Sequence, residues 1–158
     1  MLRSGIVGFV LIVTLGVGLF FSPAGAYAAD EQNSTYEGKN GLAIAGFDVV
    51  AYARTGKAIP GQARYRSRYR GSVYAFDSLR NQQAFAADPK RYLPAYGGYC
   101  AYGVRLGRKS PVDPSIFDVV DGKVHLFLNQ ATKFAWEEDR KSNKKIADNN
   151  WSKMIGNR

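Results

Sequence analysis

The sequence predicts an α+β fold, a small antiparallel sheet built from two β-hairpins with helices packed on one face. Two β-rich stretches interrupted by turn residues indicate the hairpins, at residues 64–76 and 116–128. The segment after each hairpin begins with a polar residue typical of helix N-termini and then places apolar residues at helical spacing. A length of 158 residues suits one domain.

Residues 1–28 are expected to form a cleavable secretory signal. Arg3 gives a short positive start, the apolar run Gly5–Phe21 follows, and Ala26-Tyr27-Ala28 places small residues at a cleavage site. An uncleaved membrane anchor is the alternative, but the run is shorter than the ~20 apolar residues of a spanning helix. The mature chain would then begin at Ala29, be periplasmic or secreted, and have no permanent membrane span.

The composition limits the chemistry that the chain can perform. One cysteine, Cys100, excludes an internal disulfide and a zinc site made of several cysteines. With His125 as the only histidine, a metal site made solely of thiolate and imidazole ligands is excluded as well. The formal net charge of +9 favours an anionic envelope polymer or lipid headgroup as partner, with a merely solvated surface as the alternative. Nucleic acid is not expected as the partner of an exported protein.

The predicted domain covers residues 41–154. Residues 29–40 are polar and are expected to be a flexible linker, and residues 155–158 form a C-terminal tail. Asp48 to Ala53 is expected to form a turn of helix that stops at Gly56. Asp48 would be its N-cap, although its carboxylate could instead bind a ligand.

The first hairpin carries a row of arginines at every second position. Arg64, Arg66, Arg68 and Arg70 alternate with Tyr65, Ser67 and Tyr69, and the chain turns at Gly71-Ser72. This alternation is typical of a half-buried strand. The arginine row is therefore either an anion-binding face or a solvated outer face above an inner face of tyrosines. A helix over 78–87, capped by Asp77 or Ser78, is expected next, and Asp88-Pro89 starts a short helical turn.

The second hairpin is the clearest local prediction. Asp121-Gly122 separates two β-rich runs, which is a strong signal of a tight turn. Asn129 is expected to cap a helix that extends to about Arg140, and a final helix is expected over 142–154. His125 lies on the returning strand and is predicted to be non-essential.

The segment from Pro94 to Leu106 is dense in glycine and tyrosine. If it is helical, its glycines each cost ~1 kcal/mol relative to alanine, which requires close approach by another backbone or by a ligand. One interpretation is a pocket with Cys100 at its base, lined by Tyr99 and Tyr102 and with Asp48 nearby. The other is tight packing, with Cys100 as a small buried hydrophobe.

Four short segments form an ordered set of motifs: GFDVVAY (46–52), GSVYAFDS (71–78), FAADPKRY (85–92) and YGGYCAYG (96–103). In this order and with these gaps they resemble the YHS domain family, most closely its exported, single-domain branch. The resemblance spans about residues 41–154 and implies the fold, export and, by analogy, metal binding. At the places where the metal-related versions carry cysteines, this chain has Ala51, Asp77 and Asn81.

Three functions are expected in order of preference. The first is a non-enzymatic ligand-binding module whose first candidate ligand is copper or another transition metal, with Cys100 as the metal ligand and Tyr99, Tyr102 and Asp48 around it; Cu(I) suits a thiolate best. The second is a structural or adaptor protein that binds an anionic envelope partner through a basic face. The third is an enzyme with Cys100 as nucleophile, for which His125 is the only histidine available as base.

Overall fold

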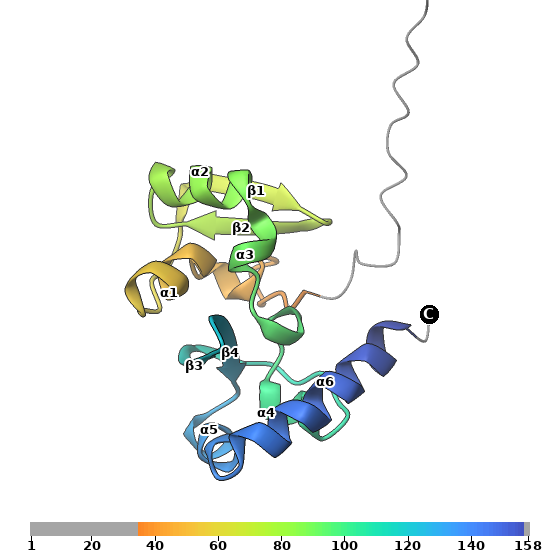
Figure 1. Cartoon of the computed structure of the whole chain (residues 1–158). Coiled ribbons are helices and arrows are strands. Elements are labelled where there is room, and N and C mark those ends of the chain that lie inside the picture. The colour runs from red at the N-terminus through yellow and green to blue at the C-terminus, as the bar shows by residue number, and fades with distance from the viewer. Residues whose placement is uncertain (1–34, 157–158) are drawn as a thin grey trace, which may run out of the picture.

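The computed structural model describes residues 35–156. The predicted signal at 1–28 and the beginning of the predicted linker lie outside the described residues. The chain forms two tiers, an upper one around the first hairpin and a lower one around the second (Figure 1). None of the helices in residues 35–156 has the length and apolar character needed to cross a bilayer.

Helices and two short hairpins alternate along the chain, which confirms the α+β class. The upper tier contains η2 (Ile44–Gly46), α1 (Val49–Thr55), β1 (Gln62–Tyr69), β2 (Ser72–Phe76), α2 (Leu79–Ala87) and α3 (Pro89–Tyr92). The remaining elements are η3 (Ala95–Gly98), α4 (Ala101–Arg105), β3 (Asp113–Val120), β4 (Lys123–Phe127), α5 (Gln130–Glu137) and α6 (Arg140–Gly156).

Both predicted hairpins form, but each is a two-stranded sheet of its own and not half of one common sheet. β1 pairs with β2, and β3 pairs with β4, both antiparallel. The outer edges of the returning strands are occupied by other segments: Ala43 donates its N–H to the carbonyl of Val73, and Cys100 forms a parallel bridge with Leu126. With these edges already paired, β2 and β4 are not joined into a common sheet.

The helix caps follow the predicted chemistry. Ser78 accepts a hydrogen bond from the N–H of Asn81 at the start of α2. Asn129 and Thr132 form a reciprocal capping box at the start of α5. The upper core packs Tyr74 and Phe76 against Phe85 of α2, and the lower core gathers around Trp136 of α5. These caps fix where α2 and α5 begin and therefore which faces they bury.

From Tyr36 onward, the segment predicted to be a linker belongs to the fold instead. Tyr36 donates its N–H to the carbonyl of Gly97 at 2.8 Å and accepts one from Ile44 at 2.9 Å. Glu37 forms a bridge with Ala43. The polar composition of this stretch gave no sign of this backbone pairing, because one of the partners, Gly97, lies 61 residues further along the chain than Tyr36.

Candidate functional site

Cys100 is buried in the core, with 1% of its surface exposed. It is the residue before α4, its N–H donates to the carbonyl of Ser110 at 3.1 Å, and its Sγ accepts the N–H of Leu128 at 3.4 Å. The thiol is thus enclosed by the protein's own backbone. This enclosure matches the interpretation of Cys100 as a small buried hydrophobe. Cys100 lines none of the three clefts found among the described residues.

The carboxylate of Asp48 has a structural role and accepts four hydrogen bonds from the protein itself. Its Oδ1 accepts the N–H groups of Val50 at 2.8 Å and Ala51 at 3.1 Å, which caps α1. Its Oδ2 accepts the N–H of Asp77 at 2.9 Å and the amide of Asn81 at 2.7 Å. Asp48 is completely buried and links α1, the end of β2 and α2, so its predicted role as an N-cap is the one the structure shows.

Tyr99 and Tyr102 are half-buried and do not enclose Cys100 in a shared pocket. Tyr99 packs edge-on against Tyr36, with ring centroids 5.7 Å apart, and lines a cleft of about 470 Å³ together with Lys109. Tyr102 lies beneath the guanidinium of Arg105, 5.6 Å from its ring centroid. The four residues of the predicted site are therefore not brought together into one cleft.

The predicted copper or other transition-metal site at Cys100 is not matched by a cluster of metal-binding side chains in the described part of the chain. Within residues 35–156, no group of three or more His, Cys, Asp or Glu side chains is placed to hold a metal ion. A transition-metal site needs several such ligands around the ion. Cys100 as a metal ligand therefore gains no support from its surroundings.

The glycine- and tyrosine-rich segment is not one helix, so the helical case considered from the sequence does not apply. Tyr96 and Gly97 have left-handed backbone conformations, and Cys100 is non-helical with φ −54° and ψ 117°, so α4 starts only at Ala101. The close approach inferred for the glycines is real, but protein atoms make it. A Cβ at Gly98 would lie 2.2 Å from Ile44 Cδ1, and one at Gly103 would lie 2.7 Å from Ser110 Oγ. Packing thus accounts for these glycines without a ligand.

His125 lies in the lower core with 1% of its surface exposed. Its ring stacks against Trp136 at 5.4 Å and meets the edge of Tyr96 at 5.5 Å, and its Nδ1 lies 3.1 Å from the carbonyl of Lys123. Burial lowers its pKa below the ordinary value. Its Nε2 and the Trp136 Nε1 are buried polar atoms without a hydrogen-bond partner among the described residues.

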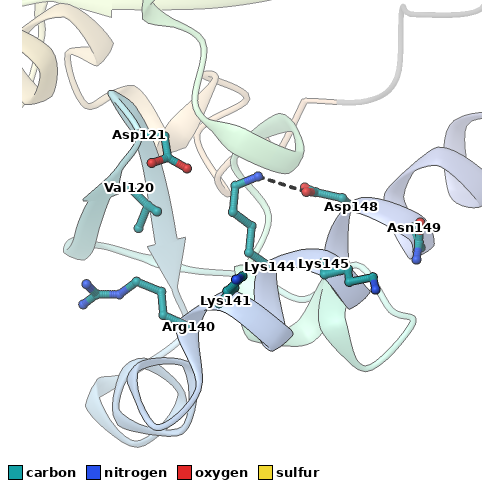
Figure 2. A pocket seen from close by; sticks show the side chains of 8 residues that line it. All are labelled: Val120, Asp121, Arg140, Lys141, Lys144, Lys145, Asp148 and Asn149. Atoms are coloured by element: carbon teal, nitrogen blue, oxygen red, sulfur yellow. Dashed lines mark hydrogen bonds and ion pairs between the residues drawn. The ribbon is translucent and has the colours of Figure 1, made fainter.

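A basic cleft lies between the tip of the β3–β4 hairpin and α6 (Figure 2). It has a volume of about 580 Å³. Four cations line it from α6, and the hairpin tip forms the opposite wall. The lining residues are Val120, Asp121, Arg140, Lys141, Lys144, Lys145, Asp148 and Asn149. We call this surface the basic cleft.

Two of the four cations are held in place by carboxylates. Arg140 lies 3.0 Å from Asp118 of β3, and Lys144 lies 2.9 Å from Asp148. Asp148 also accepts the hydroxyl of Tyr96 at 2.9 Å. Lys141 and Lys145 are exposed and form no ion pair with any residue in the described range. The cleft therefore combines two positioned cations with two that are available to an anion.

Sequence reasoning missed this cleft although a signal for it was present. The final helix was recognised from its apolar residues, while the basic pairs at 140–141 and 144–145 recur at a spacing of four, which places them on one side of the helix. The predicted arginine row is real as well: Arg64, Arg66 and Arg68 are exposed, and the tyrosines between them are half-buried. Arg64, Arg66 and Arg68 match the solvated-face interpretation and line none of the three clefts, whereas Arg70 is half-buried and lines the third cleft, of about 180 Å³.

Comparison with known proteins adds no relative. No family model, no curated protein and no solved structure matches this chain. The resemblance to the YHS domain family therefore stays a prediction, and the function has to be argued from the geometry above.

Proposed function

We propose that the chain is an exported, non-enzymatic binding module that holds an anionic component of the cell envelope in the basic cleft. The observation that carries this proposal is that four cations of α6 line one cleft and that two of them, Lys141 and Lys145, form no ion pair in residues 35–156. The lining also holds the carboxylates of Asp121 and Asp148, so four cations against two anions leave a formal excess of +2, and an excess of one sign in a cleft concentrates ligands of the opposite sign. The basic composition of the whole chain adds long-range attraction.

The groups that an enzyme or a metal site would use are shielded. Cys100 and His125 each expose 1% of their surface, so neither is reachable by a substrate without opening the core. A reactive cysteine needs an accessible, activated thiol. The burial of Cys100 and His125 supports a binding role over a cysteine-dependent enzyme. For the same reason we prefer the adaptor hypothesis to transition-metal binding.

The test compares two double variants of equal charge. Lys141→Ala/Lys145→Ala removes the unpaired cations of the cleft, and Arg64→Ala/Arg66→Ala removes two cations of the arginine row. Both pairs are exposed, so both variants should fold. Binding to dextran sulfate and to phosphatidylglycerol vesicles is measured by titration calorimetry, with dextran and phosphatidylcholine vesicles as uncharged references.

The proposal predicts that at least one anionic probe binds and that the cleft variant weakens this binding about tenfold or more. That factor corresponds to the loss of about 1.4 kcal/mol in binding free energy. The arginine-row variant should weaken it by less than threefold. Equal losses in the two variants would show that the binding follows net charge alone and would refute the cleft as the site.

A further inference from the structure

The cations of the basic cleft are arranged as a ladder along α6. Arg140 and Lys144 are separated by four residues, and so are Lys141 and Lys145. Four residues of helix advance by about 6 Å, so each pair repeats its charge at that distance along the axis. Such a ladder suits a ligand whose anionic groups repeat at a comparable spacing. A single small anion would use only part of it.

An ion pair joins the two elements that form the cleft. Arg140 of α6 contacts Asp118 of β3 at 3.0 Å, which links the helix to the opposing hairpin. Asp121 and Asp148 are exposed on the two opposite walls. A flat anionic surface that covered both walls would therefore meet two carboxylates, whereas a narrow chain can lie between them.

These features point to one form of ligand. Building on the proposed function, we infer that the basic cleft binds a single flexible polymer chain with closely spaced anionic groups, in preference to the surface of a membrane. Lys141 and Lys145 neutralise successive groups of the chain, and Arg140 and Lys144 line the path as positioned charges. Binding of this kind releases counterions from the polymer, so its affinity falls steeply with salt.

The test uses the mature protein with three phosphate-bearing probes, at equal concentrations of phosphate groups: long-chain polyphosphate, phosphatidylglycerol vesicles and inorganic phosphate. Affinity is measured at several salt concentrations, for the parent and for Lys141→Ala/Lys145→Ala. The Arg64→Ala/Arg66→Ala variant serves as the control of equal charge. Circular dichroism melts verify that all three proteins are folded.

We expect polyphosphate to bind at least tenfold more tightly than either other probe. The logarithm of its affinity should fall with the logarithm of salt concentration with a slope of about −1.4, because a single-stranded polyanion releases ~0.7 counterion per neutralised charge and two cations of the cleft, Lys141 and Lys145, are unpaired. Removing both should abolish most of the slope, and the control variant should leave it within about a fifth of the parent value.

Each other outcome has a defined meaning. If vesicles bind as tightly as polyphosphate and this binding depends on the cleft, the inference of a polymer ligand is wrong and the proposed function still holds. If inorganic phosphate binds as tightly as polyphosphate, the cleft is a site for a single small anion and the inference of a polymer ligand is wrong. If the Lys141→Ala/Lys145→Ala variant binds every anionic probe with the same affinity as the parent, both the polymer inference and the proposed function are wrong.

Discussion

The hydroxyl of Tyr96 donates to Oδ1 of Asp148 at 2.9 Å, and this bond joins the strained turn before α4 to the wall of the basic cleft. Asp148 in turn holds Lys144 at 2.9 Å. Tyr96 also packs its ring against His125 and Trp136 in the lower core. One tyrosine thus connects the buried aromatic cluster to the charged surface above it.

Tyr96→Phe should lower the free energy of unfolding by about 1 kcal/mol. The ring packing is kept and one hydrogen bond to a carboxylate is lost, a change that costs ~1 kcal/mol when the acceptor can regain water, as the exposed Asp148 can. Urea denaturation measures the change. Tyr102→Phe is the matched control, because the Tyr102 hydroxyl forms no hydrogen bond with any residue from 35 to 156, and it should shift stability by less than about 0.5 kcal/mol. Equal effects of the two substitutions would contradict the assigned role of the Tyr96 hydroxyl.

Asp48→Ala should be among the most destabilising single substitutions in the chain. It removes a carboxylate that accepts from four donors, of which only the Ala51 N–H keeps another acceptor, the carbonyl of residue 48 at 3.1 Å; each of the three donors left unpaired costs about 1–3 kcal/mol where it is buried. We expect a loss of at least about 3 kcal/mol, or failure to fold, in urea denaturation. The control is Asp88→Ala, since Asp88 precedes α3 without capping it through its side chain. A stable Asp48→Ala protein with lost ligand binding would restore the ligand-binding interpretation of this carboxylate.

Cys100 should react slowly with a thiol reagent in the native protein. The side chain is enclosed by the core, so modification requires local or global opening. Native protein is expected to react at least a hundredfold more slowly than protein in concentrated urea, followed by the absorbance of released thionitrobenzoate. A Cu(I) titration against a competing chelator completes the test, and wild type and Cys100→Ser should bind equally. Rapid labelling of Cys100, or a loss of copper affinity in Cys100→Ser, would make metal binding at Cys100 the preferred function again.

His125 should make the protein less stable in mild acid. Burial lowers its folded-state pKa below the ordinary 6.5, so the unfolded chain binds the proton more readily than the folded one. Stability is therefore full above pH 6.5 and decreases as the pH falls from 6.5 towards the folded-state pKa. The backbone carbonyl of Lys123 acts in the opposite direction on this pKa, and the charges of Lys144, Asp118 and Asp148 act on it more weakly.

The measurement is urea denaturation at pH 7.5 and 5.5 for wild type and His125→Tyr. Because His125 is the only histidine, the variant should lose most of the pH dependence in this window. Tyrosine is larger than histidine and the site is buried, so overpacking should lower the stability at pH 7.5 by about 1–3 kcal/mol. An unchanged pH dependence in His125→Tyr would show that another group is responsible.

Local signals predicted the elements of this fold well. Asp121-Gly122, Ser78 and Asn129 act through neighbours only two to four residues away, so their chemistry can be read from sequence. The separation of the hairpins into two sheets depends instead on pairing between distant segments, as between Ala43 and Val73. No local pattern encodes such a contact.

The predicted site failed for a related reason. The glycines around Cys100 do mark close approach, but sequence could not show that Ile44 and Ser110 are the approaching groups. Asp48 met its simplest expectation as an N-cap. The basic cleft forms where one side of α6 faces the tip of the second hairpin. The spacing of the cations can be read from the sequence, but the position of the hairpin opposite them cannot.

The location of a bound anion tests the central claim most directly. Backbone amide shifts of ¹⁵N-labelled mature protein are followed by NMR during titration with dextran sulfate, with uncharged dextran as reference. We predict that the largest shifts occur at residues 120–121 and 140–149, the two walls of the basic cleft. Shifts concentrated at residues 64–70 of the arginine row, with the cleft unchanged, would contradict the account.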